Sequence, residues 1–566
     1  MKGIGVSPGI AIGRAFVIKK NKAIITGVFL NNDAEISAEI ERFDKAVDSA
    51  IAEIEAIKTN TRLTDDDLAI LETQIEFLSD PQLKEEVIQK INEDKKNAND
   101  ALLEVIAGLV ELFQNMDDEY MRARSADIQD IGGRILKHLN GTDKIAQKFE
   151  PDTIIIAEDI APSDTITMDI KLIVGFATQA GSKTSHAAII AKSKGIPAVV
   201  GCGGDLLAIK DNDVIILDGR SGVLYVNPDL TEIDEYKEKR KAFIEQAQIL
   251  KALKDKPAIT TDGTKIKLTA NISGADDWDD VFTNGGDGVG LLRTEMLFMN
   301  RDTFPTEDEQ FEFYKQVALK SKGKPVIVRT IDIGGDKQLS YFGLPIEQNP
   351  FLGYRAIRIC LDKTDIFITQ LKAILRAAVF GDLKIMFPMI SNVEEVRAAK
   401  NILSEAKNEL LKEGVVFKAN IEIGIMIEIP SAAVTADILA KEVDFFSIGT
   451  NDLCQYTLAV DRMNEKISHL YDPYNPGVLR LINNVIAQGQ KHHIHVGMCG
   501  EMAGDPMATL LLLGMGLEEF SMSAASIPSI KNIIINNSME KAKEVCSKVM
   551  EMDSSKSIIT YLQSLA

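Results

Sequence analysis

The chain has 566 residues, which is too long for one ordinary domain, so we expect several domains. Hydrophobic residues make up 45% of it and charged residues 26%, a composition typical of soluble globular proteins. The formal net charge of -21 argues against nucleic acid as a partner, because phosphate backbones are held by lysine and arginine. An acidic surface favours a basic partner protein instead.

Cysteine usage and hydropathy indicate the compartment. The five cysteines are scattered and never spaced as CxxC, which predicts a reducing environment and no zinc cluster. The first residues contain no apolar signal core, and no run of about 18 apolar residues occurs anywhere. We therefore expect a cytoplasmic protein without membrane insertion.

The first quarter of the chain changes from a short strand to long helices. Residues 15–18 form an apolar run that predicts a strand, whereas apolar residues from Ile36 onward recur every three or four positions. The same period continues through residues 65–78, 83–91 and 100–116 to about residue 139. We predict a helical domain at 25–140, inserted into another domain.

After residue 151 the pattern becomes β-branched. Short strands are predicted at 152–157, 173–177 and 214–217, with one helix at 185–193. Together with the N-terminal strand they predict a small α/β domain formed by residues 1–24 and 141–228. A highly charged helix follows within residues 229–257, and a helix that links two domains indicates that they move relative to each other.

Residues 258–566 alternate between apolar strands and helical stretches. Strands are predicted at 266–272, 288–294, 326–333, 384–390, 424–429, 445–450, 495–501 and 519–523. Eight βα units in about three hundred residues predict a (β/α)8 barrel. The predicted fold class is therefore multidomain α/β with a C-terminal barrel.

A barrel carries its active site at the C-terminal ends of its strands. These ends and the loops after them contribute Arg293, Arg329, Asp332, Lys337, Arg355, Glu428, Asn451, Asp452, Arg462 and Cys499. Arginines bind phosphate and carboxylate bidentately, and a pair such as Glu428 and Asp452 can hold Mg²⁺. The set predicts a site for a small molecule that carries both groups. Each residue alone is more typical of a structural salt bridge, and Asn451 or Asp452 of a helix N-cap.

Cys499 and His186 are the candidates for reactive residues. Buried cysteines are usually inert, but one at the mouth of a phosphocarboxylate site can donate a proton as the leaving group departs. His186 follows the Gly/Ser/Thr-containing loop 180–185, at the start of a predicted helix. An imidazole there can act as a nucleophile, with backbone N–H groups holding a transferred phosphoryl group. A lone histidine is more often structural.

Six spaced segments together resemble enzyme I of the bacterial sugar phosphotransferase system, the phosphoenolpyruvate–protein phosphotransferase family. They are residues 3–9, 290–299, 329–337, 426–431, 449–453 and 497–505. Several long matches in order are a specific signal, and the similarity extends nearly from end to end. The resemblance implies phosphoryl transfer from phosphoenolpyruvate (PEP) to a protein histidine with release of pyruvate.

The resemblance also implies a role for each candidate residue. His186 matches the phosphorylated histidine, and Cys499 matches the acid that protonates the enolpyruvate leaving group. The residues that match PEP-binding positions are Arg293, Arg329, Asn451, Asp452 and Arg462. The residues that match Mg²⁺ ligands are Glu428 and Asp452.

The partners follow from the same resemblance. The helical domain of the family docks the small phosphocarrier protein HPr, which takes the phosphoryl group from the histidine and starts the sugar uptake cascade. Enzymes of the family form homodimers through the barrel. We expect both properties here.

Two positions depart from the family pattern. Ser182 stands where the family commonly has a second glycine before the Thr-Ser-His motif, which puts the geometry of that loop in question, although Lys183 keeps the positive charge. Gln129 stands where an arginine is usual, which puts one contact near the interdomain or carrier-docking face in question.

Three alternatives make different demands on the chain. Pyruvate phosphate dikinase and PEP synthase place a long ATP-binding domain before the histidine domain, and no Gly-rich nucleotide loop precedes His186 here. A PEP aldolase or mutase barrel leaves residues 1–257 unexplained. A non-catalytic PEP-binding sensor has no need for a nucleophile and an acid together, and activity toward HPr separates it from the enzyme.

Overall fold

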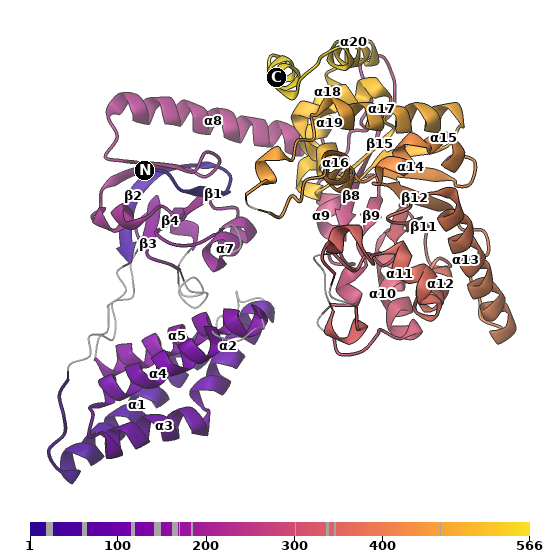
Figure 1. The fold of residues 1–566 in the computed structure, drawn as a ribbon. Coiled ribbons are helices and arrows are strands. Elements are labelled where there is room, and N and C mark those ends of the chain that lie inside the picture. The colour runs from indigo at the N-terminus through magenta and orange to yellow at the C-terminus, as the bar shows by residue number, and fades with distance from the viewer. Residues whose placement is uncertain are drawn as a thin grey trace. The chain divides into compact units, whose positions relative to one another are not determined.

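The computed structural model describes residues 1–18, 27–58, 65–114, 119–140, 149–160, 168, 170–182, 185–299, 301–335, 339–344, 347–464 and 466–565. The chain divides into two compact units, Met1–Gln246 and Ala247–Ala566, each described by itself below (Figure 1). Within the described part of the chain, no helix is both long enough and apolar enough to cross a lipid bilayer.

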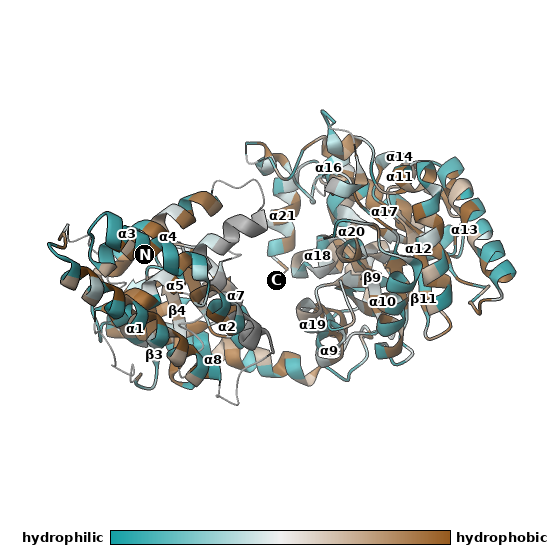
Figure 2. Ribbon diagram, turned by 90° about the horizontal axis from the view of Figure 1, so that it is seen from below, coloured by the Kyte–Doolittle hydropathy of each residue, from teal (hydrophilic) through white to brown (hydrophobic). Residues whose placement is uncertain are grey.

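The first unit contains a bundle of helices that share one apolar core. They are α1 (Asp33–Lys58), α2 (Asp65–Leu78), α3 (Pro81–Glu93), α4 (Ala98–Gln114) and α5 (Glu119–Leu139). Phe43, Ile91, Leu102 and Ile135 are fully buried in this core. In Figure 2 the helices of the bundle carry both teal and brown segments, as amphipathic helices do. The predicted helices are therefore confirmed, and Gln129 lies exposed on α5.

The first unit also contains a seven-stranded sheet with the order β1-β5-β4-β3-β2-β6-β7. Its strands are β1 (Ile4–Ser7), β2 (Ile10–Ile18), β3 (Thr153–Ala157), β4 (Ile173–Thr178), β5 (Ala198–Val200), β6 (Val214–Asp218) and β7 (Val223–Val226). β2 pairs in parallel with β3 and antiparallel with β6, which confirms that the N-terminal strand completes this sheet. The sequence did not predict β5 or β7, because such short runs show no alternation. The helix α7 (His186–Lys194) lies between β4 and β5 in the chain, and α8 (Leu230–Ala252) follows β7.

In the second unit, eight parallel strands of the described residues close into a barrel. They are β8 (Lys267–Ile272), β9 (Val289–Leu292), β10 (Val326–Arg329), β11 (Leu383–Phe387), β12 (Ile423–Ile427), β13 (Phe445–Ile448), β14 (His495–Met498) and β15 (Glu519–Met522). The eight predicted strands are confirmed. Most predictions run past the observed C-terminal end, because the residues there leave the ladder to form the loops of the site.

Helices surround the barrel strands in Figure 1. They are α9 (Trp278–Thr283), α10 (Glu307–Lys320), α11 (Ile357–Asp362), α12 (Thr364–Ala377), α13 (Val393–Glu413), α14 (Pro430–Val434), α15 (Ala436–Leu439), α16 (Thr450–Leu458), α17 (Pro476–Lys491), α18 (Pro506–Met515), α19 (Ile527–Ile535), α20 (Met539–Met550) and α21 (Ser555–Gln563). Their apolar faces and the strands form the largest hydrophobic core of the molecule.

The interior of the barrel is filled by a second, smaller apolar cluster. Leu291, Ile327, Met386, Met426, Phe445 and Cys499 form it. The packing is tight, because a Cβ added to Gly424 would approach the ring of Phe445 to 2.2 Å. The barrel interior is thus a packed core next to the side chains at the C-terminal ends of the strands. Cys499, which directly follows β14, is the member of the cluster at those ends.

The opposite, N-terminal end of the barrel holds a polar cluster around His495. Its imidazole nitrogens lie 2.8 Å from Glu518 and 2.8 Å from Glu519, and the buried Glu519 also accepts a hydrogen bond from Thr269 at 2.9 Å. Burial and the charge of Lys267 lower the pKa of His495, but the hydrogen bonds to the two carboxylates outweigh them and raise it to about 9. The folded protein therefore holds the imidazolium in a pH range where the unfolded chain releases it.

We expect this cluster to make barrel stability depend on pH. A raised histidine pKa stabilises the fold fully below the unfolded value of about 6.5, and this contribution disappears as pH rises through about 9. His495→Gln should therefore flatten the decline in the melting temperature of the barrel between these pH values. The exposed His469→Gln is the control and should keep the wild-type slope. Equal slopes in all three proteins would refute the assignment.

Candidate active site

The structure brings together charged residues from the C-terminal ends of several barrel strands. Arg329, the last residue of β10, is buried and pairs with Glu295 from the loop after β9. Its Nη1 also lies 2.9 Å from Oδ2 of Asp332, three residues further along the chain. A buried guanidinium held by two carboxylates has a fixed orientation, which suits recognition of an anionic ligand.

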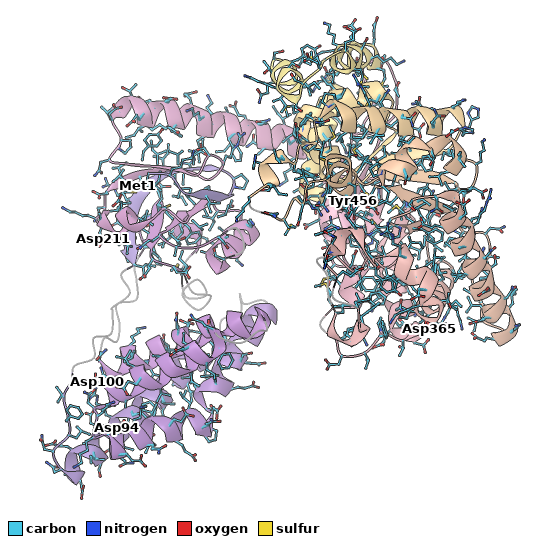
Figure 3. All side chains as sticks on the ribbon, in the orientation of Figure 1. Met1, Asp94, Asp100, Asp211, Asp365 and Tyr456 are labelled. Carbon is cyan, nitrogen blue, oxygen red and sulfur yellow. The ribbon has the colours of Figure 1, made fainter. Side chains whose placement is uncertain are left out.

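Arg355 extends this network to the next strands. Its Nε and Nη2 donate to the two oxygens of Asp332 at 3.0 and 3.2 Å, and Nη2 also donates to Asp452 at 2.7 Å. Nη1 donates to the hydroxyl of Tyr456, which is labelled in Figure 3, at 3.2 Å. Gly334, with φ of +105°, permits this approach, because a Cβ there would lie 2.9 Å from the Cα of Arg355.

Glu428 follows β12 and is almost completely buried. One oxygen accepts a hydrogen bond from the backbone N–H of Met389 at 2.6 Å. Burial raises the pKa of Glu428 to about 8, with a further contribution from the nearby charges of Asp452 and Asp332, although Arg355 and Arg329 oppose it. Burial therefore disfavours the charged form of Glu428, and a nearby cation would favour it.

Asp452 and Asn451 lie in the first turn of α16. Asp452 is buried, and its Oδ1 makes no hydrogen bond to any residue that the structure describes; Nη2 of Arg462 lies 3.7 Å from this oxygen. Asn451 exchanges two hydrogen bonds with Glu501, through Oδ1 at 2.9 Å and Nδ2 at 3.1 Å. The N-cap residue of α16 is Gly449, so the alternative that Asn451 or Asp452 is an N-cap is wrong.

Cys499 directly follows β14 and is 5% exposed. Burial raises the pKa of its thiol to about 11, while Arg329 and Arg293 act in the opposite direction. Its carbonyl accepts a hydrogen bond at 3.0 Å from Asn271, whose side-chain oxygen accepts one from Ser521 at 2.7 Å. The thiol is therefore protonated at neutral pH, and its backbone is held on two sides of the barrel.

The remaining predicted residues differ in how far the structure defines them. Arg293 follows β9 with an exposed side chain. Lys337 lies outside the described residues. His186 is the first residue of α7, and its side chain is outside the described part of the molecule. The structure thus brings Arg329, Asp332, Arg355, Glu428 and Asp452 into one network and leaves His186 in the other unit.

The loop before His186 accommodates Ser182 without backbone strain. Gly181 has φ of +117°, whereas Ser182 is absent from the residues with positive φ. The carbonyl of Ser182 accepts hydrogen bonds from the N–H of Ser185 at 3.1 Å and from its hydroxyl at 2.9 Å. Ser182 therefore does not need a left-handed backbone conformation, so a serine in place of glycine adds no strain of that kind here.

Sequence reasoning missed three participants in the site. Glu295, Tyr456 and the N–H of Met389 contact Arg329, Arg355 and Glu428 respectively. The signal for Glu295 was its place two residues after Arg293, at the end of a predicted strand. The contacts of Tyr456 and Met389 arise only from folding, because their partners are distant in the chain.

Comparison with protein families matches most of the chain. The model described as "PEP-utilising enzyme, PEP-binding domain" matches residues 247–539. The models for the N-terminal and the mobile domain of PEP-utilising enzymes match residues 2–124 and 149–222. The barrel and both parts of the first unit therefore resemble segments of the same kind of enzyme.

Curated relatives match over the full length. The phosphoenolpyruvate-protein phosphotransferase of Bacillus subtilis is 46% identical over 100% of this chain and 99% of the relative. That of Priestia megaterium is also 46% identical, over 100% of this chain and 98% of the relative. A solved NMR structure of an Enzyme I (nEIt) protein is 37% identical, covers 43% of this chain and 99% of that chain, and has a TM-score of 0.38.

We predict that Arg355 holds the barrel together as well as its site. Arg355→Met removes the cation nearest to buried Asp452 and one of the two cations that pair with buried Asp332, and breaking a buried ion pair in this way costs about 3–5 kcal/mol. The loss is measured as the decrease in the free energy of unfolding of the barrel, obtained by titration with denaturant. Adding Asp452→Asn to Arg355→Met should recover part of it, because without Arg355 the buried Asp452 retains only Arg462, at 3.7 Å.

Arg358→Met is the matched control. The guanidinium of Arg358 donates to the carbonyls of Leu352 and Gly353 at 2.9 and 2.8 Å, so its removal leaves no carboxylate unpaired by those bonds. We expect a smaller loss than for Arg355→Met. A loss of the same size in both variants would show that the ion network contributes nothing beyond an ordinary arginine.

Proposed function

Because the chain belongs to the family of phosphoenolpyruvate–protein phosphotransferases, we propose that it transfers the phosphoryl group of PEP to its own His186 and then to HPr. The full-length relatives are named for phosphoryl transfer from PEP to protein, and the chain is a PEP-dependent phosphotransferase of this kind. The non-catalytic sensor is not supported by these relatives. What remains to be proposed is which residues perform each step.

The observation that supports the site most strongly is the buried network of Arg329 and Arg355 with their carboxylates. The guanidinium of Arg329 is fixed by Glu295 and Asp332 before any ligand arrives. Catalysis of phosphoryl transfer depends mainly on such positioning and on charge neutralisation. We assign binding of PEP to Arg293, Arg329, Asn451, Asp452 and Arg462.

Glu428 and Asp452 fit a bound Mg²⁺. Glu428 is a buried carboxyl whose charged form a cation would favour, and Asp452 has a buried oxygen that makes no hydrogen bond to the described residues, so the pair offers two hard oxygen ligands. No group of three or more His, Cys, Asp or Glu suited to a metal occurs among the described residues, and Mg²⁺ commonly uses one or two carboxylates with water and substrate oxygens. When bound, the ion neutralises charge on the phosphoryl group.

The reaction balances with the residues proposed. The imidazole nitrogen of His186 that lies far from the backbone attacks phosphorus, the P–O bond to the enol oxygen breaks, and its electron pair forms the enolate of pyruvate. The methylene carbon then takes the proton of Cys499, and solvent returns a proton to the thiolate. A thiol pKa of about 11 keeps Cys499 protonated until this step. Transfer requires His186 to reach the barrel, since the two belong to separate units.

Other expectations stay predictions. They are HPr docking on residues 25–140, the linker at 229–257, homodimerisation through the barrel and a cytoplasmic location. The acidic net charge of -21 is compatible with a basic carrier.

Incubation of the full chain with PEP and Mg²⁺, with and without a basic HPr, tests the proposal. The wild type should release pyruvate, carry acid-labile and base-stable phosphate, and lose it to HPr. His186→Ala should carry none and give no phosphorylated HPr, whereas the control His492→Ala should match the wild type. Phosphate on His186→Ala would refute the assigned nucleophile, and PEP binding without turnover in the wild type would favour a sensor.

Cation binding is measured separately, by calorimetric titration of the full chain with Mn²⁺ in the absence of PEP. Glu428→Gln and Asp452→Asn should each weaken binding at least about tenfold, because each removes an anionic ligand. Glu422→Gln is the control, since Glu422 is exposed and pairs with Lys384 at 2.6 Å. Unchanged affinity in the first two variants would show that the cation binds elsewhere.

A further inference from the structure

Gln370 is a fully buried amide on α12 that the reaction above does not use. Its relative exposure is 0%, on a helix whose other buried residues are mainly apolar. A buried amide costs free energy unless its donors and acceptor are paired, and an apolar residue of similar volume would fill the same space. The contacts of this side chain therefore require an explanation other than packing.

The amide of Gln370 connects two loops of the active site. Its Oε1 accepts a hydrogen bond at 2.9 Å from the N–H of Ile331, in the loop after β10. Its Nε2 donates to the hydroxyl of Thr294, in the loop after β9, at 3.4 Å and to the hydroxyl of Tyr314, on α10, at 3.0 Å. Both ends of the amide are thus paired, and the orientation follows from the partners, because an N–H needs an acceptor.

A second link joins the same loops. The hydroxyl of Thr294 donates to the carbonyl of Arg329 at 3.0 Å. Thr294 therefore accepts from Gln370 and donates to Arg329, while being fully buried itself. Two consecutive hydrogen bonds, from Gln370 to Thr294 and from Thr294 to the carbonyl of Arg329, therefore connect α12 to the backbone of Arg329.

The two loops that Gln370 bridges, those after β9 and β10, carry charged residues of the candidate site. Thr294 lies between Arg293 and Glu295, and Ile331 lies between Arg329 and Asp332. The ion pair between Glu295 and Arg329 joins the two loops through charged residues of the site. Gln370 joins the same loops through hydrogen bonds from α12. Buried, fully paired networks of this kind fix geometry because partial breakage leaves unsatisfied groups.

We propose that Gln370 is a positioning residue, which sets the spacing of the loops after β9 and β10 so that Arg329 is aligned for PEP. This rests on the proposed function, in which Arg329 binds PEP. Gln370 acts through Thr294 and the backbone of residues 329–331 and does not touch the substrate. The consequence is that its loss should impair use of PEP more than it impairs folding.

The test uses Gln370→Met, which keeps side-chain length and removes the three hydrogen bonds. Gln310→Met is the matched control, because Gln310 is a buried glutamine on α10 whose amide donates at 3.1 Å to the carbonyl of Pro305, outside the site. Single-turnover phosphorylation of the full chain over a range of PEP concentrations gives the maximal rate and the half-saturating concentration. Melting temperatures are recorded for each variant.

Gln370→Met should lower the ratio of maximal rate to half-saturating concentration about tenfold or more, since small misplacements of binding groups cost activity on that scale. Gln310→Met removes one hydrogen bond, so it should lower the melting temperature less and keep the ratio within about threefold of the wild type. A Gln370→Met ratio that also stays within this margin, at any loss of stability, overturns the proposal and leaves the amide a structural group.

Thr294 gives a second arm should Gln370→Met fail to fold. Thr294→Val removes the hydroxyl with little change of shape, and Thr294→Ser keeps it. The valine variant should reproduce the loss of activity and the serine variant should restore most of it. Equal activity of the two variants contradicts the path through Thr294.

A double-mutant cycle separates this proposal from the function on which it rests. If Gln370 acts through Arg329, adding Gln370→Met to Arg329→Lys should lower the ratio little further, because coupled residues are not additive. Fully multiplicative losses contradict the coupling. Wild-type activity of Arg329→Lys would instead refute the assignment of Arg329, which is a distinct result.

Discussion

The candidate site depends on an imbalance of buried charge. Two guanidinium groups, those of Arg329 and Arg355, face the carboxylates of Glu295, Asp332, Glu428 and Asp452, and all six side chains are buried. Asp332 pairs with both arginines and Asp452 pairs with Arg355, whereas Glu428 forms an ion pair with neither arginine. Burial raises the pKa of Glu428 to about 8, with contributions from Asp452 and Asp332, so a bound cation would favour its charged form.

Backbone geometry allows these groups to lie so close together. Met389 has φ of +57°, which is costly for a residue with a Cβ, and its N–H faces Glu428. A Cβ at Gly449 would lie 3.0 Å from Oε2 of Glu428, so the absence of a side chain at position 449 avoids a close contact with the same carboxylate. Strain and small residues at the strand ends therefore serve the placement of the carboxylates.

The sequence predicted the elements better than the contacts. The barrel strands were predictable because each is a short β-branched or aromatic run between helical periods, and Glu428 and Asp452 follow such runs directly. Tyr456 was not predicted, since its partner lies far away in the chain, whereas Glu295 was missed although it directly follows a predicted strand. Gln370 could not be found at all, because a glutamine in an amphipathic helix reads as part of the solvent-facing side. Only its burial between two loops reveals a polar role.

Burial raises the pKa of both titratable groups that the proposed reaction needs most, with a different consequence for each. It raises the pKa of Cys499 to about 11, which preserves a proton for transfer to carbon. It raises the pKa of Glu428 to about 8, so a bound cation would favour the charged form of this carboxyl. The apolar floor formed by Leu291, Met426 and Phe445 supplies the low dielectric on the side of Cys499. The packed barrel interior thus favours the protonated form of both groups. Cys499 remains a proton donor, and Glu428 would become charged on binding a cation.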